Sequence, residues 1–126
     1  MKTPVKKFFE DYAGALLSLS TKKISSFYQT PLAIYSDAGV RTVKDDAETL
    51  SFWKEGVKPY EAMHITESIP EVLEEEQLTP TIFTSKVLWK NYDKSGKEIA
   101  QETNFYILIE DNNRLKIRGL IILSSR

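Results

Sequence analysis

Three long segments with the residue types of β-strands constrain the fold of this chain most strongly. They run over residues 81–92, 98–109 and 115–123. Two short polar stretches, residues 93–96 (Asp-Lys-Ser-Gly) and 110–113 (Glu-Asp-Asn-Asn), separate them and are typical of hairpin turns. Segments of this kind, bounded by turn residues, are typical of β-strands. This part of the chain therefore predicts an antiparallel meander.

Helical spacing dominates the first half of the chain. Apolar side chains recur at intervals of three and four over about residues 3–18, which predicts a first helix with one apolar stripe. A second, short helix opens at Ser20 or Thr21 and is expected to end at Pro31. A third helix is predicted over about 46–59, where an Asp precedes the first turn.

Shorter strand signals lie between and after these helices. Residues 32–36 and 40–43 predict two strands joined by the turn Asp-Ala-Gly. Residues 63–68 predict another strand, with Pro70 marking a bulge or a sheet edge. The acidic run 74–76 is interpreted as a solvated turn between two strands.

Helices followed by a run of antiparallel strands indicate the α+β class, with helices gathered on one face of a bent sheet. The length of 126 residues suits one domain over residues 1–126. Apolar residues make up 41% and charged residues 28%, so the chain can bury a core.

Charge and composition exclude several classes of function. The formal net charge of −1 argues against a nucleic-acid binder and a polybasic membrane-surface protein. With no cysteine and one histidine, thiolate chemistry and multi-histidine metal sites are excluded. A Gly-rich phosphate loop is absent as well, and we expect neither a metal nor a cofactor. No secretory signal or membrane-spanning run is found, which makes the cytoplasm the expected location.

The last two predicted strands are apolar on both faces. In residues 98–109, one face carries Asn104, Tyr106 and Leu108, and the other carries Phe105, Ile107 and Ile109. In the last strand, strict alternation places Ile117, Gly119 and Ile121 on one face and Arg118, Leu120 and Ile122 on the other. Helices can cover only one face, so the second is expected to be covered by another copy of the chain in a homodimer. The alternative is that the strands curl into the core and the chain covers itself.

The order of these elements resembles the nuclear transport factor 2-like superfamily, which includes ketosteroid isomerase and polyketide-cyclase-like proteins. The matching stretches are Phe9-x-x-Tyr12-Ala13-x-Ala15-Leu16, Ile24-x-x-Phe27-Tyr28, Pro31–Ser36, Gly39-Val40, Ala47-Glu48, Phe52-Trp53 and Arg114–Gly119. The resemblance implies a cystatin-like cone, in which three N-terminal helices pack on a strongly curved, mostly antiparallel sheet around one pocket, often in homodimers. The same scaffold serves enzymes and non-enzymes, so the fold does not settle the function.

The resemblance also suggests candidate site residues. The isomerase pattern of an Asp base with an oxyanion hole places Tyr12 and Asn104 as the two hydrogen-bond donors. The base position falls on Ser36, and Asp37 follows one residue later, which reverses its direction along a strand. His64 is a second candidate base, although alternation groups it with polar residues that are expected to be partly exposed. The candidate catalytic residues are therefore Asp37 and His64.

Aromatic residues provide candidate walls for the pocket. The predicted ligand-binding residues are Tyr12, Trp53, Tyr60, Trp89, Asn104 and Tyr106. Such a set is compatible with plain core packing, but pockets are also mostly apolar with a few placed polar groups. The leading hypothesis is a protein that binds a small apolar or aromatic molecule. The alternatives are an isomerase-, dehydratase- or cyclase-type enzyme on a small hydrophobic substrate, and a non-catalytic dimeric interaction module.

Overall fold

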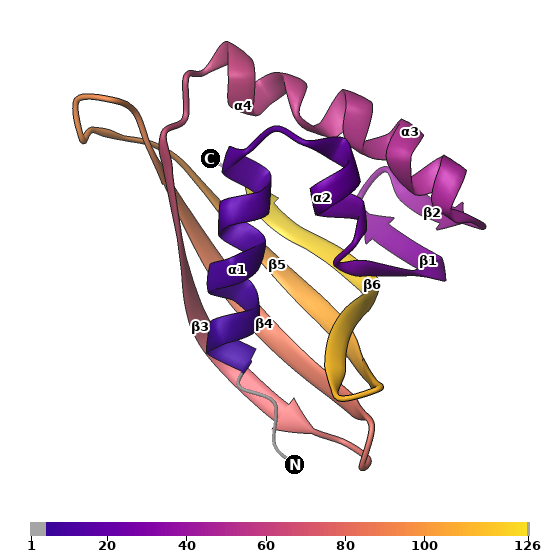
Figure 1. Cartoon of the computed structure of the whole chain (residues 1–126). Helices are drawn as coiled ribbons and strands as arrows, with labels where there is room; N and C mark the ends of the chain where they lie inside the picture. The colour runs from indigo at the N-terminus through magenta and orange to yellow at the C-terminus, as the bar shows by residue number, and fades with distance from the viewer. Residues whose placement is uncertain (1–4, 126) are drawn as a thin grey trace.

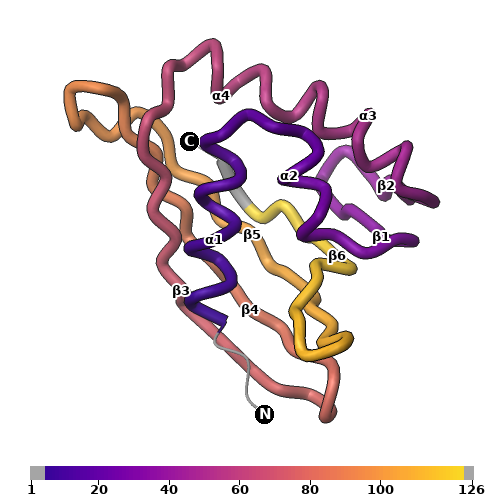
Figure 2. Tube along the Cα trace, viewed as in Figure 1, coloured from indigo at the N-terminus to yellow at the C-terminus, as the bar shows by residue number. Residues whose placement is uncertain are grey.

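The computed structural model describes residues 5–125, which form four helices and six strands. In chain order they are α1 (Val5–Leu17), α2 (Thr21–Ser25), β1 (Tyr28–Ser36), β2 (Gly39–Val43), α3 (Asp46–Gly56), α4 (Lys58–Ala62), β3 (Glu67–Gln77), β4 (Ile82–Tyr92), β5 (Glu98–Asp111) and β6 (Arg114–Ser125). The helices pack on one face of a curved sheet, with α3 and α4 running across one end of it (Figures 1 and 2). The predicted α+β, cystatin-like architecture is confirmed, with a fourth helix added.

One six-stranded sheet with the order β2-β1-β6-β5-β4-β3 forms the body of the molecule. Strands β3 to β6 are a continuous antiparallel meander, as the sequence predicts. Strand β1 lies beside β6 in parallel, and β2 pairs with β1 in antiparallel orientation. The turn between β5 and β6 places Asn112 and Asn113 in the left-handed region, with φ angles of 52° and 63°. Asparagine tolerates this conformation, which a tight hairpin turn requires.

Helix α1 follows the predicted apolar stripe. Its buried residues are Val5, Phe8, Phe9, Tyr12, Ala13, Ala15 and Leu16. The predicted start at residues 3 and 4 lies outside the described residues. At α3, the carboxylate of Asp45 accepts the backbone N–H of Glu48 at 2.9 Å, and Glu48 accepts the N–H of Lys44 at 2.8 Å. These two hydrogen bonds fix the start of α3 at the position that the sequence indicates.

Two helix predictions need correction. The second helix ends at Ser25, and Tyr28 begins β1 because it pairs with Ile117 of β6. The third predicted helix breaks at Val57 into α3 and α4, so Pro59 lies in the first turn of a new helix, where proline is accepted.

The interpretation of the acidic run 74–76 as a turn is wrong. The run belongs to β3, which continues to Gln77 and pairs with β4 along its length. The backbone register places Glu74 opposite Lys86. Because β3 is an edge strand with exposed acidic side chains, the run protects that edge against pairing with another chain. Pro70 lies in the same strand, as expected for an edge.

A bulge in β6 overturns the predicted alternation of that strand. Ile107 pairs with Gly119 and Leu108 pairs with Ile117, so Arg118 is the extra residue. Beyond the bulge the parity is reversed: Leu120 is opposite Tyr106 on the inner face. Ile117 and Leu120 are therefore both buried, although strict alternation separates them.

The core is an aromatic cluster between α1, α3 and the inner face of the sheet. Its members include Phe9, Tyr12, Tyr28, Trp53, Trp89 and Tyr106, all at most 8% exposed. The ring of Phe9 lies 4.8 Å from Tyr106 and 6.2 Å from Trp89, measured between centroids. These contacts hold α1 over β4 and β5. Within residues 5–125, no helix combines the length and apolar character needed to cross a membrane.

The opposite face of the sheet keeps a half-buried apolar patch. Phe105 pairs with Ile121, and Ile107 pairs with Gly119. A Cβ atom on Gly119 would come within 2.9 Å of Ile107 Cδ1, so glycine lets the Ile107 side chain lie across β6. This patch is the surface that the sequence analysis assigns to a homodimer.

Candidate functional site

A cavity of about 450 Å³ lies between the helices and the inner face of the sheet. Its walls come from α1, β1, α3, α4 and the ends of β4, β5 and β6. They are formed by Tyr12, Leu16, Tyr28, Phe52, Trp53, Gly56, Pro59, Tyr60, Met63, Ile65, Trp89, Asn91, Ile99, Ala100, Gln101, Glu102, Asn104, Leu120 and Ile122. Met63 and Ile122 are 42% and 37% exposed, so the cavity meets solvent beside them. Its size and mostly apolar lining are typical of sites for small molecules.

A row of polar groups on β5 crosses one wall of this cavity. The amide Nδ2 of Asn104 donates to Glu102 Oε1 at 3.0 Å and to Tyr106 Oη at 3.3 Å. Trp89 Nε1 donates to the same Tyr106 oxygen at 3.0 Å. The carboxylate fixes the orientation of the Asn104 amide, because the reversed amide would bring its oxygen against Glu102. The Asn104 Oδ1 atom is buried and has no hydrogen-bond partner among the described residues.

A second polar pair joins α1 to β1. The hydroxyl oxygens of Tyr12 and Tyr28 lie 2.5 Å apart. Burial raises the pKa of both phenols well above the ordinary value. Burial also raises the pKa of Tyr60, with the charge of Glu102 as the second cause. These phenols therefore stay protonated across the physiological range and can act as hydrogen-bond donors.

Comparison with known families identifies the chain. A family model described as NTF2-like protein (DUF6841) matches residues 2–124. The chain belongs to this NTF2-like family. The predicted resemblance is thereby confirmed. None of the curated proteins matches the chain in sequence.

Solved structures show the same fold. An NTF2-like protein of unknown function from Shewanella oneidensis superposes with a TM-score of 0.71 at 14% identity, covering 91% of this chain and 92% of that one. A ketosteroid isomerase-like protein from Erwinia carotovora gives 0.67 at 9% identity, with coverages of 96% and 91%. A cystatin-like fold protein of unknown function from Nostoc punctiforme gives 0.69 at 12%, covering 93% of this chain and 72% of that one. At such identities the likeness shows the fold alone.

Within this NTF2-like fold, five of the six predicted ligand-binding residues line the cavity: Tyr12, Trp53, Tyr60, Trp89 and Asn104. The sixth, Tyr106, lies behind that wall, where its hydroxyl accepts hydrogen bonds from Asn104 and Trp89. Trp53 differs from Trp89, because its buried Nε1 atom donates to no group in the described part of the chain.

The two candidate bases do not reach the cavity. Asp37 is exposed in the turn between β1 and β2, where the neighbouring Ser36 hydroxyl accepts the N–H of Ala38. His64 is exposed between α4 and β3 in a left-handed conformation, with φ of 54°. It borders a different hollow, beside the turn between β4 and β5. Its predicted place in a strand is therefore wrong.

The proposed oxyanion pair is also not assembled as expected. Asn104 uses its amide nitrogen for Glu102 and Tyr106, so the group without a partner is its oxygen, an acceptor. The hydroxyl of Tyr12 is engaged with that of Tyr28. Both Tyr12 and Asn104 border the same cavity, but the Asn104 amide nitrogen is already used, and the Tyr12–Tyr28 pair leaves one hydroxyl hydrogen between them as a donor.

Glu102 is the one charged side chain among the described residues that line the cavity, and it is not among the site residues predicted from the sequence. Alternation contained the signal, because Glu102 precedes Asn104 by two residues and shares its face. Tyr28 was missed as a wall residue because it was assigned to a helix.

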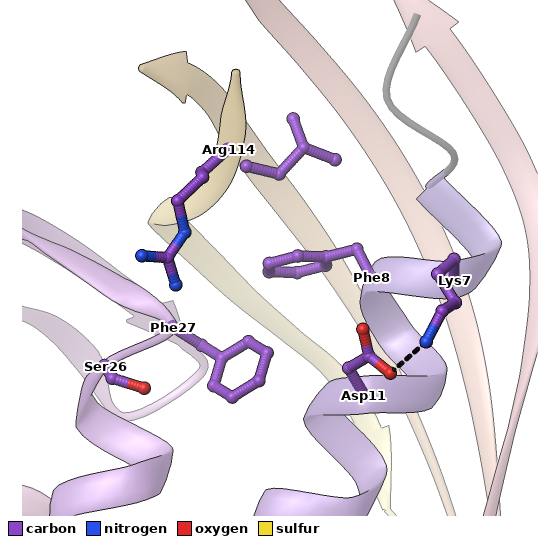
Figure 3. Close-up of a pocket in the computed structure, with 7 residues that line it drawn as sticks. Lys7, Phe8, Asp11, Ser26, Phe27 and Arg114 are labelled. Carbon is purple, nitrogen blue, oxygen red and sulfur yellow. Dashed lines mark hydrogen bonds and ion pairs between the residues drawn. The ribbon is translucent and has the colours of Figure 1, made fainter. Parts of the chain in front are cut away.

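A smaller hollow of about 240 Å³ lies between α1, α2 and the start of β6 (Figure 3). The rings of Phe8 and Phe27 form its floor, with centroids 5.6 Å apart, and Arg114 reaches over it. Lys7 and Asp11 form an ion pair of 2.7 Å at its rim, and both are exposed. An exposed ion pair of this kind contributes little to stability. The cavity beside Glu102 has a larger volume than this hollow and is the better candidate site.

Metal ligands do not gather at either hollow. In the described part of the chain, no three acidic or histidine side chains form a group that could hold a metal ion. The chemistry available in the larger cavity is therefore that of aromatic rings, phenol hydroxyls, three side-chain amides (Asn91, Gln101 and Asn104) and one carboxylate.

Proposed function

We propose that this protein binds a small molecule with an apolar or aromatic body in the cavity between its helices and the inner face of its sheet. One observation supports this most directly: the cavity has walls of large aromatic residues, yet one wall carries Glu102 and Asn104, which are hydrogen-bonded to each other, with Tyr106 behind them. Apolar walls supply affinity, and a few fixed polar groups orient the ligand.

Burial of a ligand in this cavity predicts a spectroscopic signal. Trp53 and Trp89 are the two tryptophans of the chain, and both border the cavity. A ligand that enters should change their fluorescence and raise the melting temperature, because it binds the folded state alone. Titration with a panel of one- and two-ring aromatic compounds measures both effects.

A blocking variant tests the location. Ala100 is half-buried on a cavity wall, so Ala100→Trp fills part of the space that a ligand needs. Ala47→Trp adds the same side chain on the exposed start of α3 and serves as the control. We expect Ala100→Trp to lose the ligand-induced shifts and Ala47→Trp to keep them. Shifts that survive in a folded Ala100→Trp variant would place binding elsewhere.

A second candidate function, an isomerase- or dehydratase-type enzyme, is favoured by the position of Glu102. Its carboxylate lies at the cavity wall and could accept a proton from carbon beside a carbonyl group, while a tyrosine hydroxyl donates to the carbonyl oxygen. Deuterium exchange of a cyclic ketone in D₂O tests this. The enzyme predicts exchange that Glu102→Gln abolishes, and exchange equal to that of buffer alone contradicts it.

A further inference from the structure

Glu102 is a half-buried carboxylate that forms no ion pair with the residues that the structure describes. Its carboxylate accepts a hydrogen bond from the neutral amide of Asn104, at 3.0 Å. The four ion pairs of the described residues join other side chains, and all four involve surface groups. A carboxylate at an apolar wall is stabilised by a positive charge, and no lysine, arginine or histidine side chain of the described residues forms an ion pair with Glu102.

Aromatic rings surround the same space. Tyr28 and Trp53 lie with centroids 6.0 Å apart and planes inclined by 50°, and Tyr60 borders the cavity beside them. The charge of Glu102 is felt by Tyr60 and Tyr28, since it contributes to the raised pKa of both phenols. Ring faces attract cations, and the attraction grows where water is excluded.

We infer that the ligand of this cavity is an organic cation: a protonated amine or quaternary ammonium group carried on an apolar body, with the charge beside Glu102. This inference rests on the proposed function and names its ligand class. It follows from the unpaired carboxylate together with the aromatic walls.

The charge of the cavity walls disfavours an anionic ligand. Among the described residues that line the cavity, none is lysine, arginine or histidine. An anion would meet the charge of Glu102 at low dielectric without compensation. A neutral ligand of the same shape would gain the apolar contacts but not the contact with the carboxylate.

Three probes with one indole body separate these cases: tryptamine, which carries an ammonium group, tryptophol, which carries a hydroxyl group, and indole-3-acetate, which carries a carboxylate. Affinity is measured by calorimetry at neutral pH for the unmodified protein, Glu102→Gln and Glu76→Gln. Glutamine at 102 keeps an oxygen for Asn104 and removes the charge. Glu76 is exposed on β3, so Glu76→Gln makes the same change in net charge away from the cavity.

We expect tryptamine to bind the unmodified protein about tenfold more tightly than tryptophol, with indole-3-acetate weakest. Glu102→Gln should remove the preference for tryptamine, and Glu76→Gln should keep it. Equal binding of tryptamine and tryptophol overturns the inference and leaves the proposed function standing. A preference unchanged in Glu102→Gln also overturns it. Binding of none of the probes to the folded protein overturns the inference and counts against the proposed function as well.

Discussion

The hydroxyl oxygens of Tyr12 and Tyr28 lie 2.5 Å apart in the buried core, where they join α1 to β1. Tyr28→Phe removes one partner and leaves the Tyr12 hydroxyl without its hydrogen bond. A buried polar group without a partner costs about 1–3 kcal/mol, so we expect the free energy of unfolding to fall by that amount. Urea unfolding followed by circular dichroism measures the change.

The double variant Tyr12→Phe with Tyr28→Phe distinguishes this cause from lost packing. Removing both hydroxyls leaves no unpaired group, so the double variant should lose less stability than the two single variants added together. Strict additivity would show that the two hydroxyls do not interact.

Buried phenols predict a loss of stability at high pH. Burial raises the pKa of Tyr12, Tyr28 and Tyr106 above the unfolded value of about 10. The unfolded chain therefore loses protons first, and the stabilisation is complete below about pH 10 and falls as the pH rises further. Each phenol contributes a slope of up to about 1.4 kcal/mol per pH unit. Tyr28→Phe should show a shallower fall between about pH 10 and 11, and equal slopes in both proteins would argue against this origin.

Local signals predicted the fold well. The turns that join β4 to β5 and β5 to β6 contain residues that favour turn conformations, and the stripe of α1 repeats over several turns. Tyr28 was misplaced because helical spacing around Ile24 continued past the true helix end. Its pairing with Ile117 of β6 is a contact between segments far apart in the chain, which no local pattern contains.

The candidate site was predicted only in part, because local patterns reveal some of its residues and long-range contacts place the others. Alternation along β5 brings Glu102, Asn104 and Tyr106 onto one face, and the sequence shows this directly. The bulge at Arg118 carries no comparable signal, because its cause is the register with β5. The positions of Asp37 and His64 depend on where a turn and a loop point in the folded chain, and strand alternation cannot supply that.

The apolar outer face of the sheet predicts a homodimer. Ile107 lies half-buried on that face of the single chain, beside Phe105 and Ile121. If a second copy covers it, Ile107→Glu places a charge in the interface, and light scattering should report the mass of a monomer with the circular dichroism spectrum retained. Ser51→Glu, on the exposed side of α3, should leave the mass unchanged. A monomeric unmodified protein, or a folded Ile107→Glu dimer, would contradict this interface.

The contact between Asn104 and Glu102 predicts that the variant Asn104→Asp is destabilised in a way that depends on pH. Asn104→Asp keeps the size of the side chain but brings a carboxylate to within about hydrogen-bond distance of Glu102. Two like charges at this wall repel, so the variant should be less stable than the unmodified protein at neutral pH. Lowering the pH lets the pair share a proton, and the difference should shrink.

Asn104→Leu separates repulsion from the loss of the hydrogen bond. It removes the donor for Glu102 and adds no charge, so its loss of stability should change less with pH than that of Asn104→Asp. Urea unfolding of the three proteins at about pH 7 and about pH 5 gives the comparison. A constant gap between Asn104→Asp and the unmodified protein would mean that the two carboxylates do not interact. Glu102 would then face solvent rather than the cavity, and its place in the ligand site would be lost.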